Sequence, residues 1–282
     1  MDTSYKTIAV QVDDSPHNAA RVKLAARLAV RFDAHLIGVA ATGMPASLYL
    51  GGLSGEAAAA VATYRDLLTD CAIKSLAAFE ISAAKEGVLS LEKRIIEKEA
   101  GAALCLQGRY SDLVIAGQGN PDEQAIGQPP TPAEYAVLHS AHPVLIIPYV
   151  GEYAVMDKPA LIAWNGSMEA ARAIYSAIPL LRQASRVQIV IFDVDDDLVI
   201  HGEEPGADIA LYLARHDIKV DVANHETADG DIGHALVAHA SRIDAGFVVM
   251  GAYGHSRFRE IVLGGATRTV LRSMGIPVLM SH

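Results

Sequence analysis

The chain has 282 residues, a length that favours two domains of about 140 residues each. Its 33 acidic and 23 basic residues give a formal charge of −10, which repels nucleic-acid backbones and anionic lipid, so neither nucleic acid nor membrane is expected as a partner. Cys71 and Cys105 are too isolated for a disulfide framework, and no apolar run reaches the roughly 18 residues that span a bilayer. With no signal-peptide pattern at the start, a cytoplasmic location is expected.

Two segments repeat one pattern. Residues 7–25 read TIAVQVDDSPHNAARVKLA and residues 160–177 read ALIAWNGSMEAARAIYSA, each an apolar strand, a short polar turn and a helix. In each, a serine, Ser15 or Ser167, stands where a helix N-cap accepts from the first backbone amides, and Pro16 suits the first helical position. The repetition indicates a duplicated domain.

The first half is extended in its middle. A Gly-rich loop is predicted over 42–55, interpreted as a surface excursion, with a flap as the alternative. An Ala-rich helix is predicted over 56–87.

The ends of the two halves match as well. Gly117 precedes Pro143 by 26 positions, and Gly251 precedes Pro277 by the same 26. Each half alternates strands and helices, which is typical of a parallel sheet with right-handed crossovers. In the second half the strands are expected over 160–165, 187–193, 218–224, 246–251 and 277–281.

The join between the halves is expected over 149–159, where Gly and Pro punctuate the chain. The predicted domains are therefore residues 1–150 and 157–282.

The segment 251–269, GAYGHSRFREIVLGGATRT, follows a predicted strand and runs into a helical pattern, a place where open parallel sheets bind ligands. Gly251, Gly254 and Gly264 allow close backbone approach to an anion, and the amides that begin the next helix point outward at the positive end of its dipole. From residue 245 onward the acid is Glu260, against the arginines Arg257, Arg259, Arg268 and Arg272. The pattern predicts a phosphate site, with tight turns in a solvated loop as the alternative.

On these residues the second half resembles a universal stress protein domain. ATP-binding members of that family show Gly-x-x-Gly, nine residues, and then Gly followed by Ser or Thr, and Gly251, Gly254 and Gly264 match that spacing. Gly265 departs from the Ser or Thr, and Thr267 offers a hydroxyl instead. The resemblance covers nearly the whole chain as a tandem pair.

The resemblance implies an α/β fold with two tandem domains, each an open five-stranded parallel sheet of order 3-2-1-4-5 with helices on both faces. In the family, the edge of the fifth strand is the dimer contact. Because unpaired apolar edges promote aggregation, we expect PVLIIP (143–148) and PVLMSH (277–282) to pair within the chain as a pseudo-dimer, or with a second chain in a homodimer.

The resemblance also implies a ligand, ATP or the related ADP or AMP, accompanied by Mg²⁺. In the family an acid at the end of the first strand contacts the nucleoside; Asp13 matches it, whereas Asn165 replaces it in the second half and keeps an acceptor oxygen without the charge. For Trp164, core packing is the alternative role. The candidate nucleotide-binding residues are Ala163, Trp164, Asn165, Met250, Gly251, Gly254, His255, Arg257, Gly264, Gly265, Ala266, Thr267 and Arg268.

The first half lacks this glycine loop. At the offset of 134 residues that relates Gly117 to Gly251, the later glycines are replaced by Asn120, Pro130 and Thr131, and Asp122 and Glu123 add negative charge. Nucleotide binding is therefore not expected there, and its role is interpreted as structural or regulatory.

Acidic and histidine side chains are further candidates. The run FDVDDDL (192–198) is either a set of Mg²⁺ ligands or a solvated loop. His234 and His239, five apart on a predicted helix, diverge and lack metal-ligand spacing.

Since no paired general base and nucleophile can be assigned, binding is expected rather than catalysis. Through the resemblance the chain is interpreted as a nucleotide-binding regulator in the stress response. An interaction scaffold that binds no nucleotide and a slow ATP hydrolase remain the alternatives.

Overall fold

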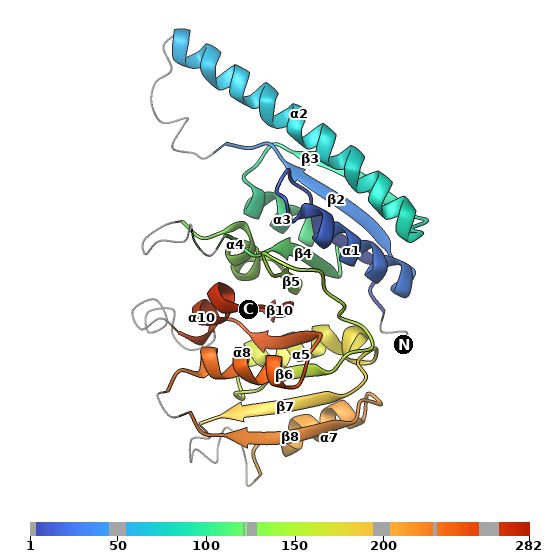
Figure 1. Cartoon of the computed structure of the whole chain (residues 1–282), viewed down its shortest axis with the longest axis vertical. Helices are drawn as coiled ribbons and strands as arrows, with labels where there is room; N and C mark the ends of the chain where they lie inside the picture. Colours follow the sequence, from blue (N-terminus) through green and yellow to red (C-terminus); the bar gives the residue numbers. More distant parts are fainter. Residues whose placement is uncertain are drawn as a thin grey trace. The chain divides into compact units, whose positions relative to one another are not determined.

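The computed structural model describes residues 4–44, 55–120, 122, 129–193, 204–227, 230–253 and 265–282. Within these ranges the chain is an α/β protein in which strands alternate with helices (Figure 1). It divides into two compact units. The N-terminal unit holds residues 4–119 and 126–142, and the C-terminal unit holds residues 143–282 with residues 1–3 and 120–125.

The N-terminal unit has a parallel sheet of strand order β3-β2-β1-β4. Helix α1 packs against α2, and α3 against α4. Because the chain moves from β1 first toward one edge and later toward the other, right-handed crossovers place these helix pairs on opposite faces. The elements are β1 (Thr7–Gln11), α1 (Asn18–Phe32), β2 (His35–Ala41), α2 (Gly55–Glu86), β3 (Leu91–Ile96), α3 (Ala100–Gly108), β4 (Leu113–Gly117) and α4 (Pro132–His139).

Helix α2 is buried only along its C-terminal part, through a stripe that includes Leu76, Phe79 and Ala83. A Cβ at Gly38 of β2 would lie 2.7 Å from the Phe79 ring, so this glycine makes room for the ring on the sheet. The N-terminal turns of α2 extend past the ends of the strands (Figure 1) and expose Tyr64. Among the described helices, none, α2 included, combines the length and the apolar run needed to cross a membrane.

The C-terminal unit has the strand order β5-β10-β9-β6-β7-β8. The strands of the second half thus follow the expected order 3-2-1-4-5 and are all parallel. The elements are β5 (Val144–Ile147), β6 (Ala160–Ala163), α5 (Met168–Leu181), β7 (Val187–Phe192), α7 (Ala207–Ala214), β8 (Val220–His225), α8 (Ile232–Arg242), β9 (Phe247–Gly251), α10 (Ala266–Ser273) and β10 (Val278–Ser281).

Strands β5 and β10 pair antiparallel, with Ile146 opposite Val278 and Val144 opposite Met280. The predicted pairing of the two apolar fifth strands within the chain is therefore confirmed. Every residue of β5 is buried, so the apolar edge is covered.

The two halves share one register between their first and fourth strands. Ile8 pairs with Leu113, and Ala160 pairs with Phe247. The offset is 152 residues for the first strand and 134 for the fourth, which makes Asn165 the equivalent of Asp13 and Gly251 the equivalent of Gly117.

The prediction that Ser15 caps the first helix is wrong. Helix α1 begins at Asn18 and has no side-chain cap. The Ser15 hydroxyl and amide instead both donate to Oδ1 of Asp13, at 2.6 and 3.1 Å. The neighbouring carboxylate is a stronger acceptor and holds the serine in the turn. The equivalent Ser167 does cap its helix, because its hydroxyl accepts from the Ala170 amide at 3.2 Å.

Candidate functional site

A cavity of about 250 Å³ lies at the carboxyl ends of β6 and β9 in the C-terminal unit. Ligands bind at this edge of open parallel sheets, beside the first and fourth strands. The lining residues are Ala163, Trp164, Asn165, Ser167, Val190, Phe192, Ile232, Leu236, Met250, Gly251, Tyr253, Ala266 and Thr267.

The structure brings seven of the predicted site residues to this cavity: Ala163, Trp164, Asn165, Met250, Gly251, Ala266 and Thr267. Gly265 and Arg268 lie at the start of α10, next to lining residues. The other four, Gly254, His255, Arg257 and Gly264, lie outside the described residues. The binding role of all thirteen stays a prediction.

Gly251 is needed for packing, whatever else it does. A Cβ on this residue would lie 2.5 Å from the Ala170 amide nitrogen and 2.8 Å from the carbonyl carbon of Glu169. The end of β9 therefore approaches the first turn of α5 too closely for any side chain.

The two ends of the glycine segment are tied together. Tyr253 adopts a positive φ of 58° after β9. Its amide donates to Oγ1 of Thr267 at 3.3 Å, and Thr267 is buried in the first turn of α10. The Thr267 hydroxyl, considered from the sequence as a substitute for the family's Ser or Thr, thus fixes the turn after β9 against α10.

The N-terminus of α10 is open. Its N-cap, Gly265, offers no side-chain hydrogen bond, and its carbonyl accepts from the Arg268 amide at 2.9 Å. The amides of Ala266 and Thr267, both in the cavity wall, have no hydrogen-bond partner among the described residues. The first turn contains no acid. Unpaired amides at the positive end of a helix dipole favour an anion.

The equivalent helix start in the N-terminal unit is closed. Thr131, at the position of Gly265, caps α4 by accepting from the Glu134 amide at 3.2 Å, and the Glu134 carboxylate accepts from the Thr131 amide at 2.7 Å. Pro132 has no N–H to offer. This capping box satisfies the helix start and adds a negative charge to it.

Trp164 and Asn165 shape the other end of the cavity. Trp164 is half-buried and lines the cavity, so it is not solely a core residue. Asn165 is exposed, and its Oδ1 accepts from the Ser167 amide at 3.2 Å. No charged side chain is found among the described lining residues.

Sequence reasoning missed six lining residues. Val190 and Phe192 end the strand beside β6, and Tyr253 lies inside the Gly-x-x-Gly segment, so strand order and spacing carried a signal for these three. Ser167 was read only as a cap. Ile232 and Leu236 come from α8 and carry no local signal.

The acidic and histidine candidates do not form a metal centre in the described part of the chain, where no group of three potential ligands gathers. Asp193 accepts from the amide and hydroxyl of Thr227 at 2.7 and 2.5 Å, and these hydrogen bonds hold its pKa below the usual value. The rest of the acidic run, residues 194–198, lies outside the described residues. His234 contacts Asp231 at the surface, whereas His239 is buried, so the two diverge.

Comparison with known proteins connects this geometry with a family. Residues 156–282 match the model of the universal stress protein family. Universal stress protein Slr1230 of Synechocystis sp. is 24% identical over 179 residues, which are 62% of this chain and 58% of that relative. The aligned region thus spans little more than half of the curated relative.

Solved structures share the fold. A universal stress protein from Archaeoglobus fulgidus DSM 4304 is 15% identical, with a TM-score of 0.73 over 98% of this chain and 95% of that one. A putative universal stress protein from Pseudomonas aeruginosa UCBPP-PA14 is 16% identical, with a TM-score of 0.60 over 98% and 93%. An Archaeoglobus fulgidus universal stress protein in complex with dAMP is 19% identical, with a TM-score of 0.35 over 50% and 97%. Residues 156–282 therefore resemble a universal stress protein domain, and the fold of almost the whole chain is shared with a solved universal stress protein.

Proposed function

We propose that the C-terminal unit binds an adenine nucleotide, ATP or the related ADP or AMP. The nucleoside would occupy the 250 Å³ cavity, and the phosphates would lie at the N-terminus of α10. The observation that carries this proposal is the open helix start at Gly265, where the amides of Ala266 and Thr267 are unpartnered among the described residues. Amides at a helix N-terminus are a common phosphate site.

The composition of the cavity wall and the charge near α10 favour the same orientation of the nucleotide, with its nucleoside in the cavity and its phosphates at the start of α10. The cavity wall is apolar and aromatic, with Trp164, Phe192 and Met250, and it has a few polar groups such as Asn165, which is the composition of a small-molecule site. Arg268 adds positive charge at the start of α10, where phosphate would lie.

The function we propose is regulatory binding in the cytoplasm during the stress response. Among the described lining residues there is no Asp, Glu, His or Lys to act as a general base, which favours binding over turnover. Mg²⁺ would enter with the triphosphate, since Asp193 is already bonded to Thr227. The β5–β10 pairing would serve as the in-chain form of the family's dimer contact.

Isothermal titration calorimetry of the full chain with ATP, with and without Mg²⁺, tests the proposal. We expect about one nucleotide per chain, and weaker binding of adenosine, which lacks the phosphates. No heat with ATP, ADP or AMP would leave the interaction scaffold as the better hypothesis. Two nucleotides per chain would show that the N-terminal unit binds as well.

A further inference from the structure

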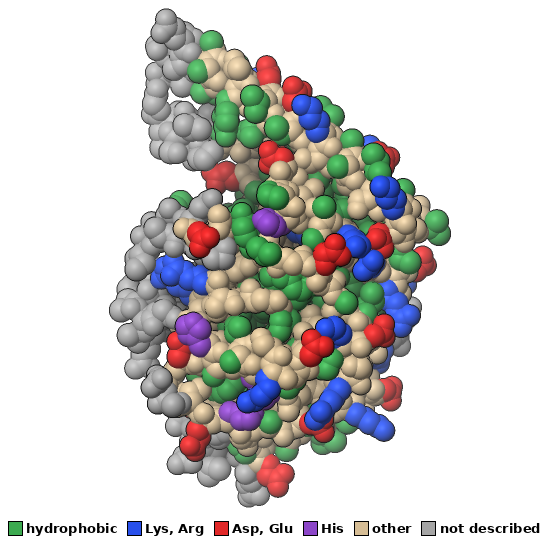
Figure 2. Space-filling view, in the orientation of Figure 1, with side chains coloured by type: hydrophobic (Ala, Val, Ile, Leu, Met, Phe, Trp, Pro, Cys, Tyr) green, Lys and Arg blue, Asp and Glu red, His purple; other side chains and the backbone are tan. Residues whose placement is uncertain are grey.

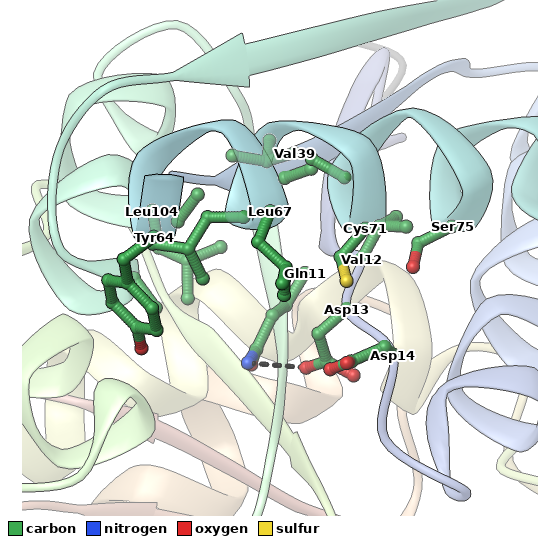
Figure 3. A pocket seen from close by; sticks show the side chains of 15 residues that line it. Gln11, Val12, Asp13, Asp14, Val39, Tyr64, Leu67, Cys71, Ser75 and Leu104 are labelled. Carbon is green, nitrogen blue, oxygen red and sulfur yellow. Dashed lines mark hydrogen bonds between the residues drawn. The ribbon is translucent and has the colours of Figure 1, made fainter. Parts of the chain in front are cut away.

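The N-terminal unit has a cavity of about 380 Å³, larger than the one in the C-terminal unit. It lies at the carboxyl ends of β1 and β2, and helix α2 covers it (Figure 3). Its size falls in the range of about 300–1,000 Å³ that is typical of small-molecule sites. The nucleotide hypothesis assigns it no ligand.

One wall of this cavity is an apolar helix face. Tyr64, Leu67, Cys71 and Ser75 of α2 recur at helical spacing and all line the cavity. Tyr64 and Leu67 are 48% and 56% exposed, although such side chains are normally buried. Hydrophobic side chains are also visible on the surface along α2 (Figure 2). An apolar body of a ligand would cover them.

The opposite end of the cavity is polar, but both carboxylate oxygens of its Asp13 already bond to other residues of the chain. Asp13 Oδ2 pairs with Arg21 at 2.8 Å and accepts from the Gln11 amide at 2.9 Å. Its Oδ1 accepts from the amide and hydroxyl of Ser15. Arg21 is 4% exposed and also donates to Asn18. The carboxylate that the family resemblance assigns to nucleoside contact is therefore neutralised and saturated by this chain's own residues.

Two other polar side chains at this end make no hydrogen bond or ion pair with the described residues. Asp14 has no hydrogen bond or ion pair with any described residue. Ser75 is only 7% exposed, yet its hydroxyl has no partner among the described residues. Figure 3 shows the Ser75 hydroxyl pointing from α2 toward the side of Asp13 and Asp14. A hydroxyl that lines a cavity and makes no bond to the described residues is available to donate to or accept from a ligand.

The charge of the wall defines the class of that ligand. The lining residues include Asp13 and Asp14, and no Lys, Arg or His among those described. Because Arg21 balances Asp13, the wall keeps the single negative charge of Asp14. We propose that this cavity binds a small organic cation, an amine. Its ammonium would lie between Asp14 and Ser75, and its apolar body would contact Leu67 of α2 and Leu104 of α3. Phosphate would be repelled by the Asp14 carboxylate.

A series of probes with one apolar body and different charges tests the charge preference. Calorimetry or ligand-observed NMR would compare 2-phenylethylamine, 2-phenylethanol and 3-phenylpropionate on the full chain. We expect the amine to bind up to about fivefold more tightly than the alcohol, the upper end for one exposed ion pair. The carboxylate should not bind. Equal binding of the amine and the carboxylate would overturn the proposal.

Variants then locate the site. Asp14→Asn should remove the preference for the amine over the alcohol, and Leu67→Trp, at an exposed position, should fill the cavity and abolish binding of both probes. Asp66→Asn, on the exposed side of the same helix and outside the cavity wall, is the matched control and should change nothing. Unchanged amine binding in both Asp14→Asn and Leu67→Trp would overturn the proposal.

Cys71 gives an independent local readout. It lines the cavity, whereas the other free cysteine, Cys105, does not. Saturating 2-phenylethylamine should slow alkylation of Cys71 by iodoacetamide, measured by peptide mass spectrometry, and leave Cys105 unaffected. Equal rates at Cys71 with and without the amine would place the binding elsewhere. Because the nucleotide is proposed in the other unit, closing the N-terminus of α10 should not change amine affinity, and the two proposals can fail separately.

Discussion

The two halves share their strand register, yet the ends of their first strands differ in chemistry. In the N-terminal unit, Gln11, Asp13 and Arg21 form a hydrogen-bonded ionic network. At the offset of 152 residues, their equivalents are the apolar Ala163, the uncharged Asn165 and the buried Ala173. The substitution of Asp13 by Asn165 is thus accompanied by loss of the cation that the aspartate pairs with. The same strand register thus carries a charged group paired within the chain in one half and an uncharged cavity in the other.

The helix starts differ in the same sense. Thr131 and Glu134 close α4, whereas Gly265 leaves α10 open. The uncapped start of α10 favours an anion in the C-terminal unit, and the Glu134 carboxylate at the start of α4 disfavours one in the N-terminal unit. Each can be reversed by substitution.

The largest effect is expected for the Arg21 network. Arg21→Ala leaves the Asp13 carboxylate, whose side chain is 29% exposed, without its cation, and should lower the free energy of unfolding by about 2–4 kcal/mol. The double change Asp13→Asn with Arg21→Ala copies the Asn165 and Ala173 pair and should cost at least about 1 kcal/mol less than the sum of the single changes. Urea denaturation of the four proteins measures this coupling. Additive costs would show that the pair is not a unit.

The second-largest effect is expected for the stabilisation of the protein by ATP, which depends on the uncapped start of α10. ATP at about a hundredfold over its dissociation constant should stabilise the protein by roughly 2.7 kcal/mol, a rise in melting temperature of roughly 2–4 °C per kcal/mol. Gly265→Asp supplies a capping carboxylate that accepts from the amides of Ala266 and Thr267, which have no partner among the described residues, and that repels phosphate, so this shift should disappear. Thr131→Asp makes the equivalent change at α4, where the helix is already capped, and should leave the shift intact. An undiminished shift in melting temperature with ATP in Gly265→Asp would show that the phosphates do not bind at α10.

The sequence was sufficient for the elements and for half of the candidate site. Apolar runs located the strands within a few residues, and the apolar edges of the fifth strands, together with the dimer contact that the family resemblance implies, predicted the pairing of β5 with β10. The larger cavity was not predicted, because the helix over 56–87 has no local signal for what it covers. What the helix covers depends on the contact of Phe79 with Gly38, which only the folded chain shows. Ser15 was misassigned for a similar reason, since the competing acceptor, Asp13, is revealed by the turn geometry.

A third comparison uses the equivalent glycines at the ends of β4 and β9. Gly251→Ala places a methyl group 2.5 Å from the Ala170 backbone nitrogen, so β9 or α5 must shift, at about 1–3 kcal/mol. At Gly117 the methyl group meets no backbone atom but the guanidinium of Arg21, which must shift within its hydrogen bonds to Asp13 and Asn18. Gly117→Ala should therefore cost less than Gly251→Ala. Thermal unfolding of both variants measures the difference. Equal costs would mean that α1 and α5 approach their strands equally closely.

The smallest effect depends on pH and on one helix position that differs between the halves. His239 of α8 is the equivalent of the buried Gln107 of α3, at the offset of 132 residues that also relates the cavity-lining Leu104 and Leu236. His239 is 5% exposed; its Nε2 lies 2.8 Å from Oε1 of Gln188, and its Nδ1 accepts from Arg242. Since Arg242 can only donate, Nε2–H is the donor to Gln188, and the ring is held neutral. Burial lowers the pKa of His239, and the charges of Arg242 and of His225, whose ring centroid lies 4.7 Å away, lower it further.

The folded state therefore binds a proton at His239 less readily than the unfolded chain does. The stabilisation is complete above the unfolded pKa of about 6.5 and is lost as the pH falls below it, by up to about 1.4 kcal/mol per pH unit until the folded pKa is reached. Gln107, at the equivalent position of α3, has no titratable group and contributes no such slope. Urea denaturation between pH 7.5 and 5 should show this decline in the native protein and a flatter profile in His239→Gln. His142→Gln, at an exposed histidine of the N-terminal unit, is the control and should keep the native profile. If the free energy of unfolding of His239→Gln declined with falling pH as steeply as that of the native protein, other groups would cause the acid sensitivity. This helix position would then not distinguish the two halves.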